Sequence, residues 1–216
     1  MIIKRLKSVD EIHQILKEYR NSSSKKYRGQ SNSKWSLIPK AGREIYSETE
    51  DEEIFRHWKR RAQLYLSRQN YTEWELLSIA QHTGLPKRLL DWSHNPLVAF
   101  FFATLENFDE DGAVFIISPS KFVDFDTVTP FKIKSDYLFY QPNTSSERLA
   151  NQFGYFSIHK KPDEPLDDEK IEKIIIPKRF KREISRMLNQ YGINYLLLFP
   201  DLEGLSKHLS WFYEKR

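Results

Sequence analysis

The sequence contains no cysteine, and its other shortages are also informative. Without cysteine the chain can form neither a disulfide nor a thiolate metal site. It has no apolar run of the roughly 18 residues that a membrane-spanning helix needs. The apolar stretch at residues 1–3 is too short for a signal peptide, and charged residues follow at once. We therefore expect a cytoplasmic protein with no membrane partner.

Several common catalytic motifs are missing as well. The sequence has no Walker A loop, no Gly-x-Gly-x-x-Gly fingerprint and no Gly-x-Ser-x-Gly elbow. Its six histidines are scattered, without a His-Glu-x-x-His motif or a pair spaced by four residues. These absences count against P-loop, Rossmann and α/β-hydrolase proteins, and we expect no metal.

What the chain does contain is typical of a folded globular protein. Of its 216 residues, 39% are hydrophobic, 14% are aromatic and 30% are charged. A disordered chain would not carry so many aromatic residues. The length suits one large domain over residues 1–216, because no linker or internal repeat divides it. The net charge of +4 permits attraction to nucleic acid or to phosphorylated ligands without requiring it.

Local signals predict helices and strands in mixed order. Ser8 and Glu11 have the spacing of a capping box, and Asn95 with Pro96 marks the start of a wholly apolar helix at the centre of the core. The acidic cluster at 48–53 suits the positive end of a helix dipole. The order lacks regular βαβ alternation, which favours an α+β fold with a small mixed or split sheet flanked by helices. The expected elements are helices at 9–20, 47–70, 73–83, 96–104, 145–153, 177–191 and 201–213; strands at 26–30, 113–118, 155–159, 171–176 and 195–199; and extended or irregular segments at 35–39 and 132–140.

The first segment with unusual polarity is Tyr27-Arg28-Gly29-Gln30. An arginine in a short strand can hold a phosphate or a carboxylate, and a following glycine lets a ligand approach closely. Alternatively, Arg28 forms a salt bridge at the strand edge. We treat Arg28, Gly29 and Gln30 as candidate ligand-binding residues.

The second segment runs from Ala80 to Ser93. Gln81 falls at the edge of an apolar helical face, so its amide either ties a loop or faces a ligand. His82 in the last turn is a candidate catalytic residue, although the helix dipole alone would favour it there. Arg88 and Asp91 form a structural ion pair, or Arg88 binds a ligand anion that Asp91 orients.

The third segment leads from Asp91 into the apolar helix. Trp92 either stacks on a planar ring of a ligand or is an ordinary core residue. Ser93 and Asn95 precede a helix N-terminus, where backbone N–H groups can bind an anion. In the fourth segment, Glu147 and Arg148 begin a short helix, and Gln152 before a glycine ties a loop or bonds a substrate. The candidate catalytic residues are therefore Asp91, Gln152, His82 and Glu147, and the candidate binding residues also include Gln81, Arg88, Trp92, Ser93, Asn95 and Arg148.

Two of these segments resemble the FRG domain, a family named for its [FY]-R-G motif. The resemblance covers Tyr27-Arg28-Gly29-Gln30 and the long stretch from Ala80-Gln81-His82 to Phe102-Ala103, and extends more loosely to Leu205. It implies a family core of about 27–205 behind an N-terminal helix within 1–20. Lys87 departs from the family pattern, which usually has threonine there. The family is common in bacteria and phages and implies a name rather than an activity.

A weaker resemblance is to ADP-ribosyltransferases of the Arg-Ser-Glu type. Arg28 is similar to the arginine that holds the NAD phosphates in that family, and Leu89–Ser93 is similar to a later strand of its site. Gln152 would take the last position of the motif. Asp91-Trp92-Ser93 departs from Ser-Thr-Ser, and no Glu-x-Glu or Gln-x-Glu stands near Gln152.

These observations lead to one main hypothesis and two alternatives. The main hypothesis is a protein that acts on NAD or a related nucleotide, by ADP-ribosyl transfer or glycohydrolysis, in a bacterial or phage conflict. In it Arg28 and Arg88 hold phosphates, Trp92 stacks on a base, Asp91 or Glu147 stabilises positive charge, and Gln152 or His82 orients the nucleophile. One alternative is a non-enzymatic module that binds nucleic acid or protein through the basic run from Lys178 to Arg186. The other is a metal-independent nuclease that uses His82 and Asp91.

Overall fold

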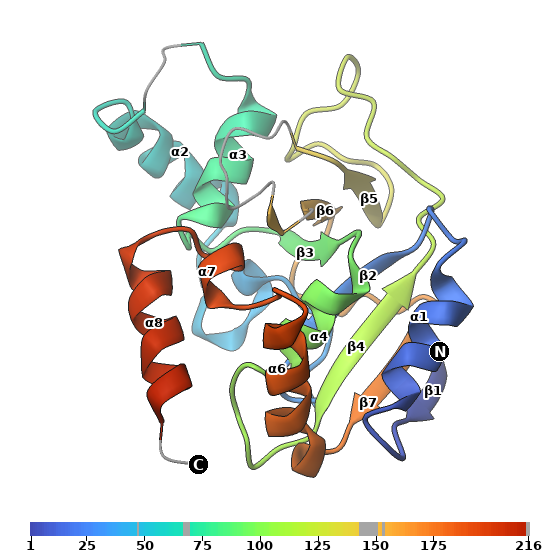
Figure 1. Ribbon diagram of the computed structural model, residues 1–216. Coiled ribbons are helices and arrows are strands. Elements are labelled where there is room, and N and C mark those ends of the chain that lie inside the picture. Colours follow the sequence, from blue (N-terminus) through green and yellow to red (C-terminus); the bar gives the residue numbers. More distant parts are fainter. Residues whose placement is uncertain (47, 67–69, 143–150, 153, 215–216) are drawn as a thin grey trace.

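A computed structural model describes residues 1–216 except 47, 67–69, 143–150, 153 and 215–216. Within the described residues, seven strands join in a single sheet that does not close into a barrel (Figure 1). The expected α+β class is confirmed. The strands are β1 (Ile2–Arg5), β2 (Lys26–Gln30), β3 (Leu89–Ser93), β4 (Gly112–Ile117), β5 (Tyr137–Tyr140), β6 (Gly154–His159) and β7 (Glu172–Ile176).

The sheet is mixed and has a weak junction at its middle. Its strand order is β1-β7-β4-β2-β3-β6-β5, with β1 parallel to β7 and the other pairs antiparallel. Strands β2 and β4 pair over five positions, whereas β2 and β3 pair only at Tyr27 and Ser93. The sheet therefore consists of two well-paired halves that meet at one residue pair.

Helices cover one face of the sheet in two groups (Figure 1). Three of them pack on the half made of β1, β7, β4 and β2, around the buried α4. Two others pack on the half made of β3, β6 and β5. The helices are α1 (Glu11–Tyr19), α4 (Pro96–Thr104) and α6 (Lys181–Gln190) in the first group; α2 (Asp51–Ala62) and α3 (Glu73–His82) in the second; and α7 (Tyr195–Leu198) and α8 (Leu202–Tyr213) at the C-terminal end.

Loops cover the opposite face of the sheet. Leu37 and Leu166 pack there against side chains of β3 and β4, including Leu90, Trp92 and Phe115. Because successive side chains of a strand point to opposite faces, Leu90 and Trp92 face this cluster while Leu89, Asp91 and Ser93 face the helices. That alternation decides which residues of β3 reach the site.

The capping signals located most helices correctly. The Oδ1 atom of Asn95 accepts the N–H of Leu97 at 2.9 Å, and Asp201 caps α8 in the same way. Gly84 and Gly192 follow helix ends with φ angles of 89° and 77°, which a residue with a Cβ rarely adopts. The apolar helix α4 lies at the centre of the first core, as expected.

Other local predictions were wrong. Residues 2–5 of the expected N-terminal helical region form β1, and the helix begins only at Glu11, whose carboxylate accepts the Lys7 N–H instead of closing a box with Ser8. The helix expected at 47–70 is shorter and spans Asp51–Ala62. Residues 195–199, expected as a strand, contain the short helix α7, which Asn194 caps.

Among the described residues, no helix combines the length and the apolar character that crossing a membrane requires.

Candidate functional site

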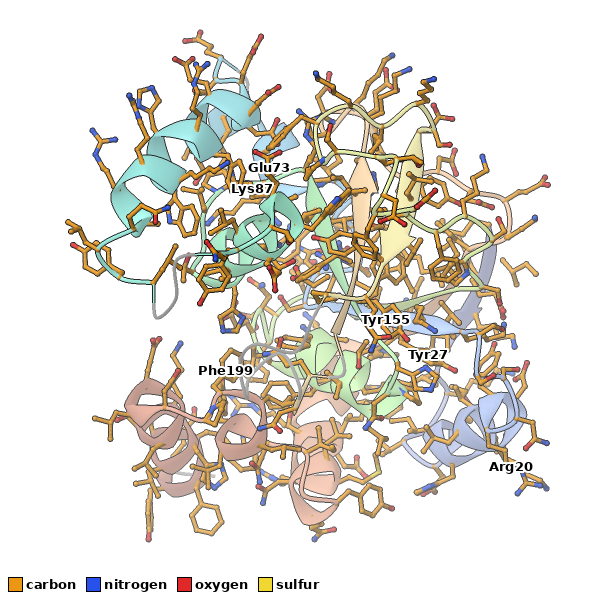
Figure 2. The ribbon with its side chains drawn as sticks, turned by 90° about the horizontal axis from the view of Figure 1, so that it is seen from above. Arg20, Tyr27, Glu73, Lys87, Tyr155 and Phe199 are labelled. Carbon is orange, nitrogen blue, oxygen red and sulfur yellow. The ribbon has the colours of Figure 1, made fainter. Side chains whose placement is uncertain are left out.

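A pocket of about 330 Å³ opens where the two halves of the sheet meet. It lies between α3 on one side and α4 on the other, with the ends of β2, β3 and β6 at its base. Figure 2 shows Tyr27 and Tyr155, from β2 and β6, close together in this region. The lining residues are Tyr27, Arg28, Gly29, Gln81, His82, Gly84, Asp91, Trp92, Ser93, Val98, Ala99, Phe102, Gln152, Gly154, Tyr155 and Phe156.

Arg28 fills the gap that opens between β2 and β3. Its Nη1 donates a hydrogen bond to the Asp91 carbonyl oxygen at 2.7 Å and lies 3.6 Å from the Asp91 carboxylate. Its side chain is 13% exposed, and its Nε has no hydrogen-bond partner among the described residues. Burial lowers the pKa of Arg28, and the charge of Asp91 opposes that shift. A guanidinium nevertheless stays charged in a protein, so the base of the pocket is cationic.

Asp91 carries the exposed negative charge of the pocket. Its side chain is 58% exposed, and Nε2 of Gln81 donates to both of its carboxylate oxygens, at 3.1 and 3.3 Å. The Oε1 atom of Gln81 is buried without a partner among the described residues. The carboxylate is thus oriented by Gln81 from α3 and by Arg28 from β2, while it remains open to a ligand.

His82 and Ser93 also belong to the pocket lining. The hydroxyl of Ser93 donates to the carbonyl of Gln152 at 2.8 Å and accepts the N–H of Asn95 at 3.0 Å. The Oδ1 atom of Asn95 accepts the N–H of Leu97, and its carbonyl oxygen accepts the N–H of Val98. The first N–H groups of α4 are therefore already hydrogen-bonded. The anion site expected at this helix N-terminus is therefore not formed.

Gly29 belongs to the pocket lining and also permits close packing of α4 on β2. A Cβ at this position would lie 1.9 Å from the carbonyl oxygen of Ala99 and 2.7 Å from the nitrogen of Ala103. Only glycine lets α4 lie this close to β2, and the close packing brings Val98, Ala99 and Phe102 to the pocket wall.

The indole of Trp92 lies in the cluster on the opposite face of the sheet. It is 2% exposed, contacts Phe139 and donates from Nε1 to the hydroxyl of Ser157 at 2.9 Å. That hydroxyl lies 2.9 Å from Nε2 of His159, whose pKa is lowered to about 3 by burial and then by the charge of Arg28. Trp92 is therefore a core residue below the pocket, and the stacking role expected for it is not supported.

Arg88 lies outside the pocket lining. Its guanidinium pairs with Asp51 at the start of α2, with Nε 3.0 Å from Oδ2, and both side chains are largely buried. The predicted pair with Asp91 was wrong, because Arg88 pairs with Asp51 instead, while its phosphate contact stays a prediction. Lys87 is fully buried beside it, donates to the Asp51 carbonyl at 3.0 Å and also lies outside the pocket lining. Its departure from the family pattern does not change the pocket.

The remaining candidates differ in their positions. Gln152 borders the pocket, but its Nε2 donates to the Leu198 carbonyl at 3.0 Å, so the amide ties this loop to α7. Gln30 is buried away from the lining, with Nε2 3.4 Å from the Ser36 carbonyl oxygen. Glu147 and Arg148 lie outside the described residues. Within the described part of the chain, no three histidine or acidic residues are grouped to hold a metal.

Sequence reasoning missed the apolar and aromatic wall of the pocket. Tyr155 faces the Nζ atom of Lys26, which lies 4.4 Å from the centre of its ring. Tyr27, whose pKa is raised to about 12 by burial and then by Glu172, belongs to the Tyr-Arg-Gly motif. Val98 and Phe102 lie in a helix that is apolar all round, so no pattern separates its pocket side from its core side.

One of three comparisons with known proteins found a match. The family model of the FRG domain matches residues 23–112, so the chain contains an FRG domain. The match covers β2, α2, α3, β3 and α4, which supply Arg28, Gln81 and Asp91, and it ends before β6. The search of curated proteins and the search of solved structures found no match.

Proposed function

We propose that this FRG-domain protein binds NAD or a related nucleotide in the pocket between α3 and α4 and cleaves its glycosidic bond. The observation that carries the proposal is the Asp91 carboxylate, which is held by Gln81 and Arg28 and faces a pocket with an aromatic wall. Aromatic and aliphatic walls with a few oriented polar groups are typical of sites for flat organic ligands.

The polar atoms of the pocket suit a nucleotide. Arg28 brings a cation to the pocket lining, and Gln81 holds the Asp91 carboxylate there. A guanidinium in the lining suits a ligand that carries a phosphate. Phe102 and Tyr155 supply the apolar surface against which a ring can pack.

The reaction that fits this arrangement is cleavage at the ribose C1′. The bond from C1′ to the nicotinamide nitrogen breaks, its electron pair leaves with nicotinamide, and positive charge develops on the ribose. A carboxylate close to that charge lowers the barrier, which is the part we assign to Asp91. Water or an acceptor nucleophile then bonds to C1′ and loses its proton, and we assign to His82, which belongs to the lining, the role of orienting it.

A second candidate function, a metal-independent nuclease, would use His82 and Asp91, which also have roles in the first proposal. His82 and Asp91 both line the pocket, as a metal-independent nuclease would require. We rank it lower because the apolar wall suits one enclosed ring better than a strand of charged phosphates. The nucleic-acid module is weaker again, because Lys181 of the basic run is fully buried against three carbonyl oxygens and Arg182 lies 3.7 Å from Glu214.

Incubation of the purified protein with NAD tests the proposal. We expect release of nicotinamide, detected by liquid chromatography, and saturable binding in calorimetry. A folded protein that neither binds nor cleaves NAD, but cuts RNA or DNA in a His82-dependent manner, would establish the nuclease instead. The cytoplasmic location is part of the same proposal. So is the setting in bacterial or phage conflict, because an enzyme that destroys NAD harms the cell that contains it.

A further inference from the structure

A second hollow of about 260 Å³ adjoins the first pocket. It lies between the end of α1, the segment at 21–23 and the start of α4, and Tyr27 lines both spaces. Figure 2 shows Tyr27 with Tyr155 toward one side and Arg20 toward the other. The residues that line the hollow are Leu16, Tyr19, Arg20, Asn21, Ser22, Ser23, Tyr27, His94 and Pro96.

The hollow is rich in hydrogen-bond donors, and no carboxylate from the residues that the structure describes lines it. Within the described part of the chain, Arg20 makes no ion pair or hydrogen bond through its side chain, and His94 is likewise exposed without a partner. The nearby Glu172 carboxylate is already engaged by the Tyr19 hydroxyl and the Lys25 ammonium, each at 2.6 Å. An arginine and an imidazole beside two serine hydroxyls form a set that matches an anion.

The wall of this hollow has a defined shape. Lys26 is 4% exposed, and its Nζ lies 3.1 Å from the Ser24 carbonyl oxygen and 3.4 Å from that of Ser23. The same ammonium lies over the ring of Tyr155 in the first pocket. One buried lysine therefore fixes the 21–24 segment and a wall of the neighbouring pocket together.

The sizes of the two spaces complement each other. A volume of 330 Å³ is near the lower limit for ligand pockets, which begin at about 300 Å³. It can hold a ring with its ribose but not a whole dinucleotide, so the charged remainder of such a ligand must lie outside it. We propose that the hollow with Arg20 and His94 binds the phosphate part of the ligand whose ring occupies the first pocket. This inference rests on the proposed function.

Calorimetry with three probes tests the inference on the full chain. The probes are NAD, inorganic pyrophosphate and nicotinamide, and the variants are Arg20→Gln and the matched control Lys17→Gln, an exposed residue of α1. We expect Arg20→Gln to weaken NAD and pyrophosphate binding at least tenfold and to leave nicotinamide binding unchanged. Lys17→Gln should change none of the three, and both variants should melt like the wild type because both side chains are exposed.

The outcomes separate this inference from the proposed function. If NAD binds to Arg20→Gln and to the Arg20→Gln/His94→Asn double variant as tightly as to the wild type, the phosphate assignment is overturned while the pocket proposal stands. If pyrophosphate binding depends on Arg20 but the protein neither binds nicotinamide nor cleaves NAD, the hollow is an anion site and the proposed function fails. A wild-type protein that binds none of the probes overturns both.

Discussion

Arg28 is hydrogen-bonded to the backbone of Asp91 and lies within ion-pair distance of the side chain of the same residue, 2.7 and 3.6 Å away. The two residues belong to strands that pair at only one position, so the guanidinium occupies the space where further strand pairing would lie. Arg28 thus donates to the Asp91 carbonyl where β2 and β3 are not paired, and it also orients the Asp91 carboxylate. Structure and proposed chemistry both depend on this contact.

Replacing Arg28 should affect stability and binding together. In Arg28→Gln the Asp91 carbonyl loses its donor, and we expect a loss of about 1–3 kcal/mol in the free energy of unfolding. Nucleotide binding should fall as well, because the cation at the base of the pocket is gone. Urea unfolding and calorimetry measure the two effects. A variant as stable as the wild type would show that water replaces the guanidinium without cost.

Asp91→Asn separates catalysis from folding. The amide keeps the shape of a side chain that is 58% exposed but removes the charge that faces Arg28, so we expect the free energy of unfolding to fall by no more than about 1 kcal/mol. Cleavage of NAD should fall on the order of 100-fold or more. Asp109→Asn, at an exposed position outside the pocket, is the matched control. Undiminished nicotinamide release by Asp91→Asn would remove Asp91 from the mechanism.

Arg88→Met should destabilise the protein without changing the pocket. It leaves the carboxylate of Asp51, which is 3% exposed, without its cation, and breaking a buried pair in this way costs about 3–5 kcal/mol. The affinity of the folded variant for a nucleotide should equal that of the wild type, as measured below its melting temperature. A selective loss of affinity with normal stability would instead return Arg88 to the binding site.

Gly29→Ala tests the close approach of α4. The added methyl group would overlap the Ala99 carbonyl, a backbone atom that cannot turn away, so we expect a loss of about 3 kcal/mol or more. Gly192→Ala is the comparison, because it meets no atom within 4 Å and costs only its positive φ, about 1–2 kcal/mol. Thermal melting of both variants should show that Gly29→Ala loses more stability than Gly192→Ala. Equal losses of stability would contradict the packing argument.

The buried Lys87 should make stability depend on pH. Burial lowers its pKa in the folded protein from 10.5 to about 7, against the opposing charge of Asp51. Between these two values the unfolded chain binds more protons than the folded one, so this contribution to stability rises with pH. From pH 7 to 9 the wild type should gain on the order of 2 kcal/mol relative to Lys87→Met. Urea unfolding at both pH values measures it, and identical pH profiles would mean that Lys87 is solvated.

Elements with strong end signals could be predicted from the sequence, whereas elements defined by distant partners could not. Asn95 and Gly84 mark helix ends through bonds and angles of neighbouring residues, and both were found. Strand β1 was missed because all four of its residues are exposed and its partner, β7, lies about 170 residues further along the chain. Residues Tyr195–Leu198 have strand-like composition, but the Asn194 cap decides the conformation.

The candidate site was predicted in part for the same reason. Arg28, Gln81 and Asp91 stand out as polar residues in apolar elements, and the structure brings them together. Arg88 has an equally unusual position, but its partner Asp51 lies in an acidic cluster that a helix dipole explains equally well. Which carboxylate a buried arginine meets depends on tertiary packing, which charge spacing along the chain does not encode.

The single pair between Tyr27 and Ser93 has a consequence for how a ligand should affect the molecule. Whatever seats itself in the pocket touches α4 and β2 on one half and α3 and β3 on the other. A ligand that contacts both halves of the sheet would hold them together. Because it binds only the folded protein, its binding would raise the free energy of unfolding. Screening compounds for a rise in melting temperature is therefore a direct way to identify the natural occupant.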